Sequence, residues 1–262
     1  MLSLQHLQYA CIRAIVNTSL YVRRSSWLSP DTQPDGVTTY ASRRDLFPSR
    51  VFTPRARAGQ QQRLPLVVCV HGRGFMVNNP AVDDPLARQM ADKSECVVVS
   101  IDYRKSPQNK FPLAYDDIVE QSLAAIDDQD LPIDRDRVVL CGRSGGGNLV
   151  LAAAQHPRLR HRLTGVVALY PVCDFVPSAE QKMVQRPDPS IPDFLGKSYS
   201  SVLDLYLDDS AKDSSTDVRL SPAHFASRDH LPPNVLLVGC EHDMLCHEAE
   251  VMANRLAADL PP

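Results

Sequence analysis

The sequence has no long apolar run and no excess of basic charge. No stretch approaches the ~18 consecutive apolar residues that a membrane-spanning helix requires. The 28 basic residues are outnumbered by 31 acidic ones, and the net charge of −3 gives no electrostatic basis for binding nucleic acid or an anionic membrane. These absences predict a soluble globular protein without a membrane span and without a nucleic-acid partner.

Paired cysteine motifs are missing as well. The seven cysteines contain no Cys-x-x-Cys pair, which disfavours zinc-binding and thioredoxin-type functions. Four cysteines lie in or beside apolar runs, where a free thiol behaves as a small hydrophobic side chain: Cys69, Cys96, Cys141 and Cys240. An odd number of cysteines in a chain of 262 residues indicates a reducing compartment, so we expect a cytoplasmic location.

Acidic residues are absent before Asp31, whereas Arg13, Arg23 and Arg24 occur among Leu, Ile, Val and Ser. This composition is compatible with an organellar transit peptide. It also fits an amphipathic helix that packs onto the rest of the protein, and we favour that interpretation.

Short Val-rich runs are what the sequence has in abundance. Five of them are continuous instead of alternating, which is typical of strands buried on both faces of a parallel sheet. These runs are 66–70, 96–101, 137–141, 165–170 and 234–240, with 50–53 as an additional edge strand. Helical periodicity lies between them, at 84–92, 113–126 and 148–155. The alternation predicts an α/β fold with a mostly parallel, doubly wound sheet in one domain, 1–262.

Two regions interrupt this alternation, about 1–45 and 174–219. The second contains four prolines and a short helical stretch near 201–207. An insertion after a strand lies over its carboxyl end, where open α/β sheets place their ligand crevice. We therefore expect both regions to be cap or lid elements over one pocket.

The strongest local motif is Gly142-Arg143-Ser144-Gly145-Gly146, between a Val-rich strand and an Ala/Leu-rich helix. A sharp strand-to-helix turn of this kind lifts the serine hydroxyl above the sheet edge, and the flanking glycines leave room for it. The alternative is an ordinary glycine-rich turn or a phosphate loop. The sequence has no Gly-Lys-Ser/Thr and no Gly-x-Gly-x-x-Gly, which disfavours nucleotide binding.

A second glycine-rich segment, His71-Gly72-Arg73-Gly74-Phe75, directly follows an earlier strand. Such a loop can turn backbone N–H groups toward one point and form an oxyanion hole for acyl transfer. Alone, it would more simply be a plain turn. Because Ser144 follows a strand of the same sheet, the oxyanion interpretation becomes the better one.

At these motifs the chain resembles the hormone-sensitive-lipase-like family of α/β-hydrolases, the "fold-3" carboxylesterases. The matching segments are 71–75, Asp102-Tyr103-Arg104 through Pro107, 142–148, Tyr170-Pro171, 220–222, 231–233 and Asp243-Met244-Leu245. Their order and spacing hold from about 64 to 256.

The resemblance implies an α/β-hydrolase fold with a helical cap and a role for each matching residue. Ser144 would be the nucleophile and Asp243 the acid that orients the base. The backbone N–H groups of Arg73, Gly74 and Gly145 would hold the oxyanion, in a loop shaped by Gly72 after the motif residue His71. From the residues alone, Asp243 is ambiguous, because an aspartate before a helix is most often an N-cap.

Two positions depart from the family pattern. Arg73 replaces the middle glycine of the oxyanion loop, where a long cation could gate the pocket or attract an acidic substrate. Arg143 replaces the aspartate before the nucleophile and exchanges a negative neighbour for a positive one.

The catalytic histidine of the family is missing from its expected place. It would follow Asp243 by a few dozen residues, after one more strand, but only 19 residues follow here. None of the eight histidines occupies that place: His6, His71, His156, His161, His224, His230, His242 and His247. We expect a truncated product that lacks the last strand and the histidine loop and leaves a sheet edge uncovered. An inactive relative, or His242 or His247 as a substitute base, are the alternatives.

The leading functional prediction is a serine carboxylesterase that acts on small or medium small-molecule esters without a metal or organic cofactor. Because loss of the base costs roughly 10⁶ in turnover, we expect low or absent activity. The alternative is a hydrolase-fold protein that binds a small ligand without turnover, as a receptor does. A protein-interaction scaffold that uses the sheet edge is a third option, without a positive feature in the sequence.

Overall fold

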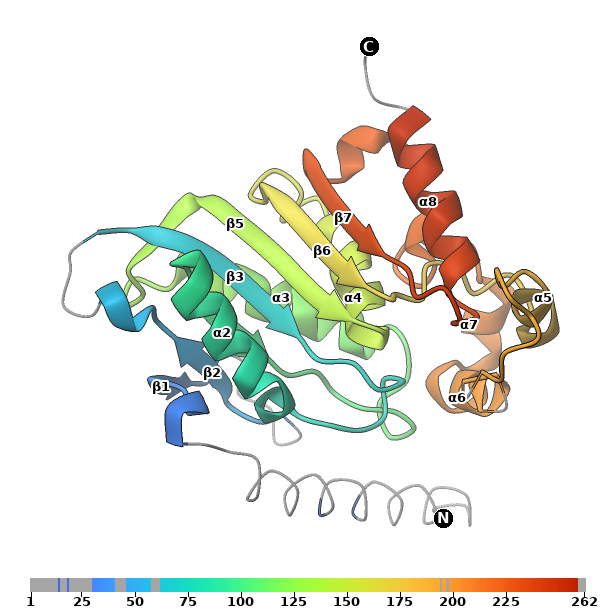
Figure 1. Ribbon diagram of the computed structural model, residues 1–262, viewed down its shortest axis with the longest axis horizontal. Coiled ribbons are helices and arrows are strands. Elements are labelled where there is room, and N and C mark those ends of the chain that lie inside the picture. Colours follow the sequence, from blue (N-terminus) through green and yellow to red (C-terminus); the bar gives the residue numbers. More distant parts are fainter. Residues whose placement is uncertain are drawn as a thin grey trace.

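A seven-stranded, mostly parallel sheet runs through the computed structural model (Figure 1). The structure describes residues 30–40, 46–57, 62–193, 195–196 and 198–258, and residues 14 and 18 singly. The strands are β1 (Gly36–Thr38), β2 (Ser49–Phe52), β3 (Leu64–Val70), β4 (Val97–Ile101), β5 (Ile133–Arg143), β6 (Gly165–Leu169) and β7 (Asn234–Val238). Their spatial order is β1-β2-β4-β3-β5-β6-β7. The β1–β2 and β2–β4 pairs are antiparallel, and the other four pairs are parallel.

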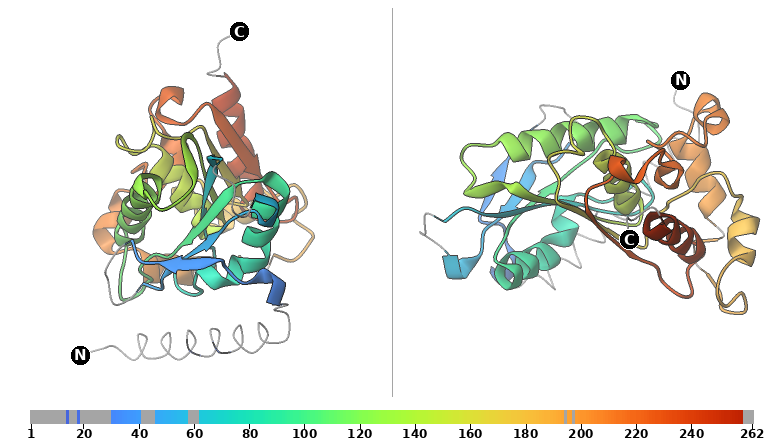
Figure 2. Two further views of the ribbon diagram at one scale, coloured as in Figure 1. Left: turned by 90° about the vertical axis from the view of Figure 1, so that its left-hand side faces the viewer. Right: turned by 90° about the horizontal axis from the view of Figure 1, so that it is seen from above.

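Helices cover both faces of this sheet. The longer ones are α2 (Asp84–Ser94), α3 (Leu113–Asp127), α4 (Gly145–Ala154) and α8 (Cys246–Ala258). Helix α2 lies on one face, while α3 and α4 lie on the other (Figure 2). This two-sided cover is what the right-handed crossovers of parallel strands produce, and it explains why the central strands are apolar on both faces.

Three short helices gather beyond the carboxyl ends of the parallel strands (Figure 1). They are α5 (Ala179–Val184), α6 (Tyr199–Tyr206) and α7 (Asp209–Asp213), all within the insertion expected at 174–219. A capping box starts α5: the Ser178 side chain accepts from the N–H of Gln181, whose own side chain accepts from the Ser178 N–H. The insertion therefore has its own helical structure on the side of the sheet where the predicted site residues lie.

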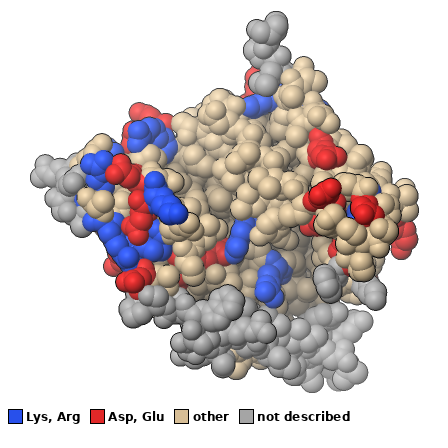
Figure 3. All heavy atoms as spheres, viewed as in Figure 1, with Lys and Arg blue, Asp and Glu red and all other residues tan. Residues whose placement is uncertain are grey.

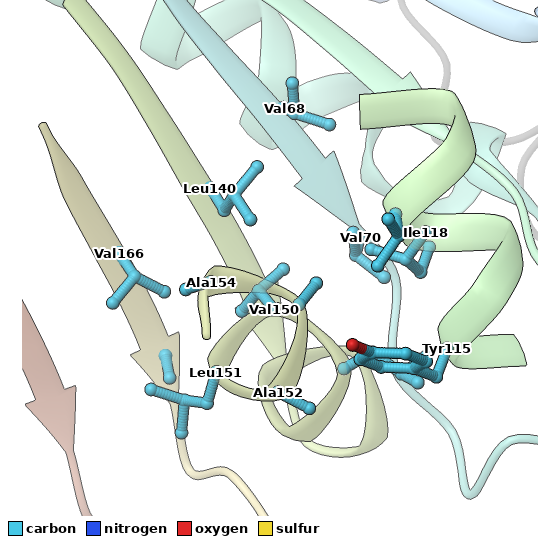
Figure 4. Packing of buried hydrophobic residues seen from close by; sticks show 14 of the residues in the cluster. Val68, Val70, Tyr115, Ile118, Leu140, Val150, Leu151, Ala152, Ala154 and Val166 are labelled. Atoms are coloured by element: carbon cyan, nitrogen blue, oxygen red, sulfur yellow. The ribbon is translucent and has the colours of Figure 1, made fainter. Parts of the chain in front are cut away.

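The main hydrophobic core lies between the sheet and helices α3 and α4 (Figure 4). Leu140 and Val166 point from β5 and β6 toward Val150 of α4, and all three are buried. A smaller cluster lies on the other face, toward α2. It contains Phe52, Cys69, Ala87, Ala91, Cys96, Val98 and Cys141. The expectation that Cys240 behaves as a small hydrophobic side chain is wrong, because Cys240 is exposed.

The predicted strands and helices are confirmed, with shifted boundaries. The fifth strand begins at Ile133, four residues earlier than predicted, because the register shifts between Pro65 and Leu66 and the charged stretch before Val138 bulges. The predicted strand at 50–53 exists as β2, but its assignment to the sheet edge is wrong. Strand β1 pairs outside it, and three of the four β2 residues are buried.

The N-terminal cap prediction falls mainly on residues that the structure leaves undescribed. Of the stretch 1–45, the structure describes 14, 18 and 30–40, where Gly36–Thr38 joins the sheet as β1. The predicted N-terminal helix or transit peptide lies outside the described residues. Among the helices that are described, none is long and apolar enough to cross a membrane.

Strand β7 forms an open edge in the described part of the sheet, where it pairs with β6 alone. Two of its side chains are large, apolar and exposed: Leu236 by 54% and Val238 by 39%. Few charged side chains lie on the surface over β5, β6 and β7 (Figure 3). The uncovered sheet edge expected from the sequence is therefore present.

Candidate active site

Ser144 occupies a strained turn between β5 and α4. Its φ of 51° and ψ of −121° lie outside the regions that side-chain-bearing residues normally adopt. The turn is held by the Ser144 N–H, which donates to the Leu169 carbonyl at 2.9 Å, and by the Ser144 carbonyl, which accepts from the Asn148 N–H at 3.0 Å. A Cβ on Gly142 would lie 2.2 Å from the Gly146 carbonyl oxygen, so the turn tolerates only glycine at 142.

The glycine-rich loop after β3 lies against this turn. A Cβ on Gly72 would lie 3.2 Å from the Cβ of Ser144, and one on Gly146 would lie 2.4 Å from the His71 carbonyl oxygen. The helix start and the loop thus meet backbone to backbone. A Cβ on Gly74 would contact Val202 of α6 at 3.4 Å, so the 174–219 insertion reaches this loop.

Three consecutive residues of the loop have positive φ: Arg73 at 90°, Gly74 at 61° and Phe75 at 62°. This conformation turns the peptide units away from the sheet ladder. Within the described residues, the N–H groups of Arg73, Gly74 and Gly145 donate no hydrogen bond. Such groups are open to an anionic oxygen.

His71 supports the loop from beneath. Its Nε2 lies 2.8 Å from Oδ1 of Asp102 and its Nδ1 lies 3.1 Å from the Gly72 carbonyl oxygen. Lys105 donates to the same Asp102 oxygen at 2.5 Å, and the ring of Tyr103 stacks on the imidazole at a centroid distance of 4.5 Å. His71 is fully buried in this network, which makes it a support for the loop.

Burial and charge set the protonation of this network. Burial lowers the pKa of His71, and the positive charge of Lys105 lowers it further. Burial opposes ionisation of Asp102, but the hydrogen bond with His71 and the charge of Lys105 outweigh it and hold the Asp102 pKa below its usual value. Asp102 is thus a buried carboxylate with three nitrogen partners, because the Phe47 N–H also donates to its Oδ2, at 3.0 Å.

The two arginines that depart from the family pattern lie in different surroundings. Arg143 pairs with the carboxylate of Asp83, just before α2, so its charge is neutralised locally. Arg73 is exposed, and among the described residues its guanidinium has no ion-pair partner. Of the two cations, Arg73 is the one whose charge remains available.

Asp243 follows β7 and is half-buried. Its Oδ1 accepts from the Leu245 N–H at 3.0 Å, a contact within the turn before α8. Because α8 begins at Cys246, three residues later, Asp243 does not occupy the helix N-cap position that the residues alone also allowed. Burial raises the pKa of Asp243, and the nearby carboxylate of Asp193 raises it further. Asp193 itself accepts from the Met244 N–H at 2.6 Å.

None of the described histidines hydrogen bonds to Ser144 or Asp243. His224 pairs with Asp174 at 3.1 Å, His71 is committed to Asp102, and His242 is exposed. His242 and His247 flank Asp243 in the sequence, but neither has a hydrogen bond to its carboxylate. His6 lies outside the described residues.

Two contacts that sequence reasoning missed join the insertion to the segment after β7. One is the bond from the Met244 N–H to Asp193. The other is a buried ion pair between Lys182 of α5 and Glu248 of α8, whose Oε1 also accepts from the Cys173 N–H at 2.7 Å. No local signal in the sequence marks these residues, because the partners in each contact lie 51 and 66 residues apart.

No metal centre is evident in the part of the chain that is described. No group of three or more His, Cys, Asp or Glu side chains is arranged there to hold an ion.

Comparison with known proteins places this geometry in a family. Residues 67–260 match the model of a family described as having the alpha/beta hydrolase fold. An arylesterase from Saccharolobus solfataricus is 34% identical over 131 residues, which is 50% of this chain and 41% of that protein. The carboxylesterase NlhH of Mycobacterium tuberculosis is 34% identical over 117 residues, 43% of this chain and 34% of that protein. The matches thus span well under two thirds of these curated relatives.

Solved structures agree over a longer part of the chain. An esterase from Pyrobaculum calidifontis has a TM-score of 0.78 at 27% identity. The match covers 96% of this chain and 80% of the esterase chain. EstE1, a thermostable carboxylesterase cloned from a metagenomic library, has a TM-score of 0.78 at 28% identity, with 96% of this chain and 83% of that chain covered. Because that family model matches residues 67–260, the chain belongs to the family described by the alpha/beta hydrolase fold.

Proposed function

We propose that the protein is a serine carboxylic-ester hydrolase and that Ser144 is its nucleophile. The observation that carries the proposal is the contact between the strained Ser144 turn and the loop at Gly72. A turn that raises a hydroxyl beside free main-chain N–H groups is the arrangement that acyl transfer needs. The arylesterase and carboxylesterase names of the relatives agree with it.

In the proposed reaction, Oγ of Ser144 attacks the ester carbonyl carbon. The oxygen of that carbonyl becomes an oxyanion that accepts from the N–H groups of Arg73, Gly74 and Gly145. Collapse releases the alcohol and leaves an acyl-Ser144 ester, which water then hydrolyses to the acid. Small or medium acyl groups fit a site that the 174–219 insertion covers as a cap.

This mechanism needs a base that accepts the hydroxyl proton of Ser144. Asp243 would orient a base, but its carboxylate contacts the Leu245 N–H instead of a histidine. We therefore propose slow turnover for the chain of 262 residues, reduced by roughly 10⁶ relative to a complete triad.

Covalent labelling of Ser144 tests the proposal directly. A fluorophosphonate should modify Ser144, and mass spectrometry should locate the adduct there. Labelling should vanish in Ser144→Ala and persist in Ser201→Ala, which removes an exposed hydroxyl from the cap helix α6. A folded protein that shows no Ser144 adduct would contradict the proposal.

Added imidazole tests the missing base. Because imidazole can take the hydroxyl proton, p-nitrophenyl ester turnover should rise with imidazole concentration in the unmodified protein. Imidazole also hydrolyses such esters in solution, so Ser144→Ala supplies the background. Equal imidazole dependence in both proteins would show that Ser144 is not the nucleophile.

A ligand-binding role without turnover is the second candidate. Two observations favour it: the Asp243 carboxylate contacts the Leu245 N–H instead of a histidine, and the Ser144 hydroxyl has no hydrogen-bond partner among the described residues. Saturable thermal stabilisation by an ester that is never hydrolysed, with or without imidazole, would support this candidate over the first.

A cytoplasmic location belongs to the same proposal. The six cysteines that the structure describes are free thiols, the state that a reducing compartment maintains.

A further inference from the structure

Two of these thiols lie side by side on the central strands. Cys69 of β3 and Cys141 of β5 are direct register partners in a parallel pair, so their side chains project from the same face of the sheet. Both belong to the small cluster toward α2 and are only 5% and 6% exposed. Cys96 lies in the same cluster but is not in register with either.

Backbone spacing already suits a covalent link between them. Neighbouring strands lie about 4.8 Å apart, within the range of about 4.4–6.8 Å that Cα atoms joined by a disulfide span. Register partners on one face also direct their Cβ atoms the same way. No strand has to slide or turn over for the two sulfur atoms to meet.

The pair is chemically asymmetric. The pKa of Cys141 is lowered because the Cys69 side chain hydrogen bonds to it, whereas that hydrogen bond and burial raise the pKa of Cys69 well above its usual value. A thiolate at Cys141 is stabilised by the neighbouring S–H of Cys69. A thiolate next to a second thiol is the arrangement of an oxidisable dithiol.

Access to Cys141 comes from the open side of the sheet. The register row through Cys69 and Cys141 continues to Val167 on β6 and to Leu236 on β7. Exposure rises along this row, from the buried Cys141 through the half-buried Val167 to Leu236 at 54%. A small oxidant can approach along this apolar face.

The position of the pair links it to the candidate active site. Cys69 lies two residues before His71, at the end of the strand that leads into the glycine-rich loop. Cys141 lies three residues before Ser144, on the strand that leads into the serine turn. A disulfide between Cys69 and Cys141 would therefore affect the glycine-rich loop and the serine turn together.

We propose that Cys69 and Cys141 form an oxidisable dithiol, a redox site that crosslinks the two strands carrying the candidate active-site loops. A peroxide is the oxidant. The Cys141 thiolate attacks one peroxide oxygen, the O–O bond breaks, and the departing hydroxide takes a proton to become water. The resulting sulfenic acid at Cys141 is attacked by the sulfur of Cys69, which loses its proton. The S–O bond breaks, and hydroxide leaves as a second water.

In total, two thiols and one hydrogen peroxide react to give one disulfide and two waters. Each sulfur loses one electron, and the peroxide gains two. Because a disulfide holds its sulfur atoms about 2.05 Å apart, closer than two unbonded thiols can come, crosslinking draws the β3 and β5 side chains together. The loop at 71–75 and the turn at 142–145 then shift relative to one another.

Peptide mapping tests the crosslink without reference to esterase activity. Trypsin should release Cys69 in peptide 64–73, Cys141 in peptide 138–143 and Cys96 in peptide 94–104. After hydrogen peroxide treatment of the folded protein, we expect 64–73 joined to 138–143 in non-reduced digests, and free peptides again after dithiothreitol. The exposed Cys240 is replaced by serine in every sample, which prevents crosslinks between molecules through that thiol.

Single variants make the assignment specific. Cys69→Ala and Cys141→Ala should each abolish the crosslink, whereas Cys96→Ala, from the same cluster, should retain it. Crosslinks that run through Cys96, or a 69–141 link that forms only in urea, would overturn the proposal. Circular dichroism of each variant before oxidation confirms that it is folded.

Hydrogen exchange tests the effect on the loops. Amide exchange in segments 71–76 and 142–148 should change at least threefold on oxidation and return after reduction. Exchange in α8 should stay constant. A crosslinked protein with unchanged exchange in both segments would refute the link between the redox site and the candidate active site.

Discussion

Gly72 lies directly against Arg143: a Cβ on Gly72 would come within 2.5 Å of the Arg143 carbonyl oxygen. Two segments 71 residues apart in the sequence thus meet at a point with no room for a methyl group. The glycine-rich loop at 71–75 and the serine turn can be adjacent only because this position is glycine.

Gly72→Ala should therefore separate the two segments. We expect at least tenfold slower fluorophosphonate labelling of Ser144 and a loss of about 1–3 kcal/mol in unfolding free energy, as overpacking typically costs. Gly36→Ala is the matched control, because nothing lies within 4 Å of a Cβ there. Equal labelling rates in the two variants would show that the contact at Gly72 does not matter for Ser144.

Arg73→Gly should stabilise the fold. Arg73 holds a φ of 90°, which costs a side-chain-bearing residue free energy that glycine does not lose. Glycine also gives the unfolded chain more conformational entropy, which offsets part of this gain. We therefore expect the unfolding free energy, measured by urea denaturation, to rise by about 0.5–1 kcal/mol. Arg73→Ala removes the guanidinium but keeps the strain, so its stability should remain near that of the parent.

Arg143→Ala should destabilise the protein through Asp83. The Asp83 side chain is only 6% exposed, and removal of its cationic partner leaves a buried carboxylate unpaired. We expect a cost of about 2–4 kcal/mol, part of which Asp83→Ala recovers in the double variant. Arg137→Ala breaks an exposed pair with Asp134 and should cost less than about 1 kcal/mol. Additive effects of the Asp83 and Arg143 variants would mean that the pair is not coupled.

Glu248→Gln should alter how stability depends on pH. Burial raises the pKa of Glu248 to about 7, above the 4.5 of a free glutamate, and Lys182 only partly opposes this. A carboxyl with a raised folded-state pKa binds its proton more tightly in the folded protein, so its stabilisation is complete below pH 4.5 and is lost as the pH rises to about 7.

Relative to Glu248→Gln, the parent protein should lose up to about 3 kcal/mol of unfolding free energy between pH 4.5 and 7. Chemical denaturation at several pH values measures this difference. The exposed Glu250→Gln on the same helix should follow the parent. Parallel pH curves for the parent and Glu248→Gln would contradict the raised pKa.

The sheet and the serine turn could be predicted from the sequence because their signals are local. Continuous Val-rich runs indicate strands that are buried on both faces of the sheet. Glycines at 142 and 146 indicate a turn in which there is no room for a side chain. Strand β1 was missed because Gly36–Thr38 is short and mostly exposed, so it leaves no apolar pattern.

Long-range polar contacts could not be predicted in the same way. Asp193 reaches Met244, and Asp83 reaches Arg143, across 51 and 60 residues. Tertiary packing determines which residues become partners, and the sequence around a single charged residue does not indicate its partner. The sequence did identify Arg143 as unusual, but only the structure shows that Asp83 neutralises it.

The open edge at β7 has a practical consequence for handling the protein. Among the described residues, no strand pairs with the outer side of β7, which exposes Leu236 and Val238 and has no charge among its five residues. Such an edge can pair with the strands of other chains and promote aggregation. Concentrated samples should therefore precipitate or form fibrillar material sooner than samples of Leu236→Lys. A lysine at this position acts as a gatekeeper: it keeps the edge hydrated and leaves the Ser144 turn, two strands away, untouched.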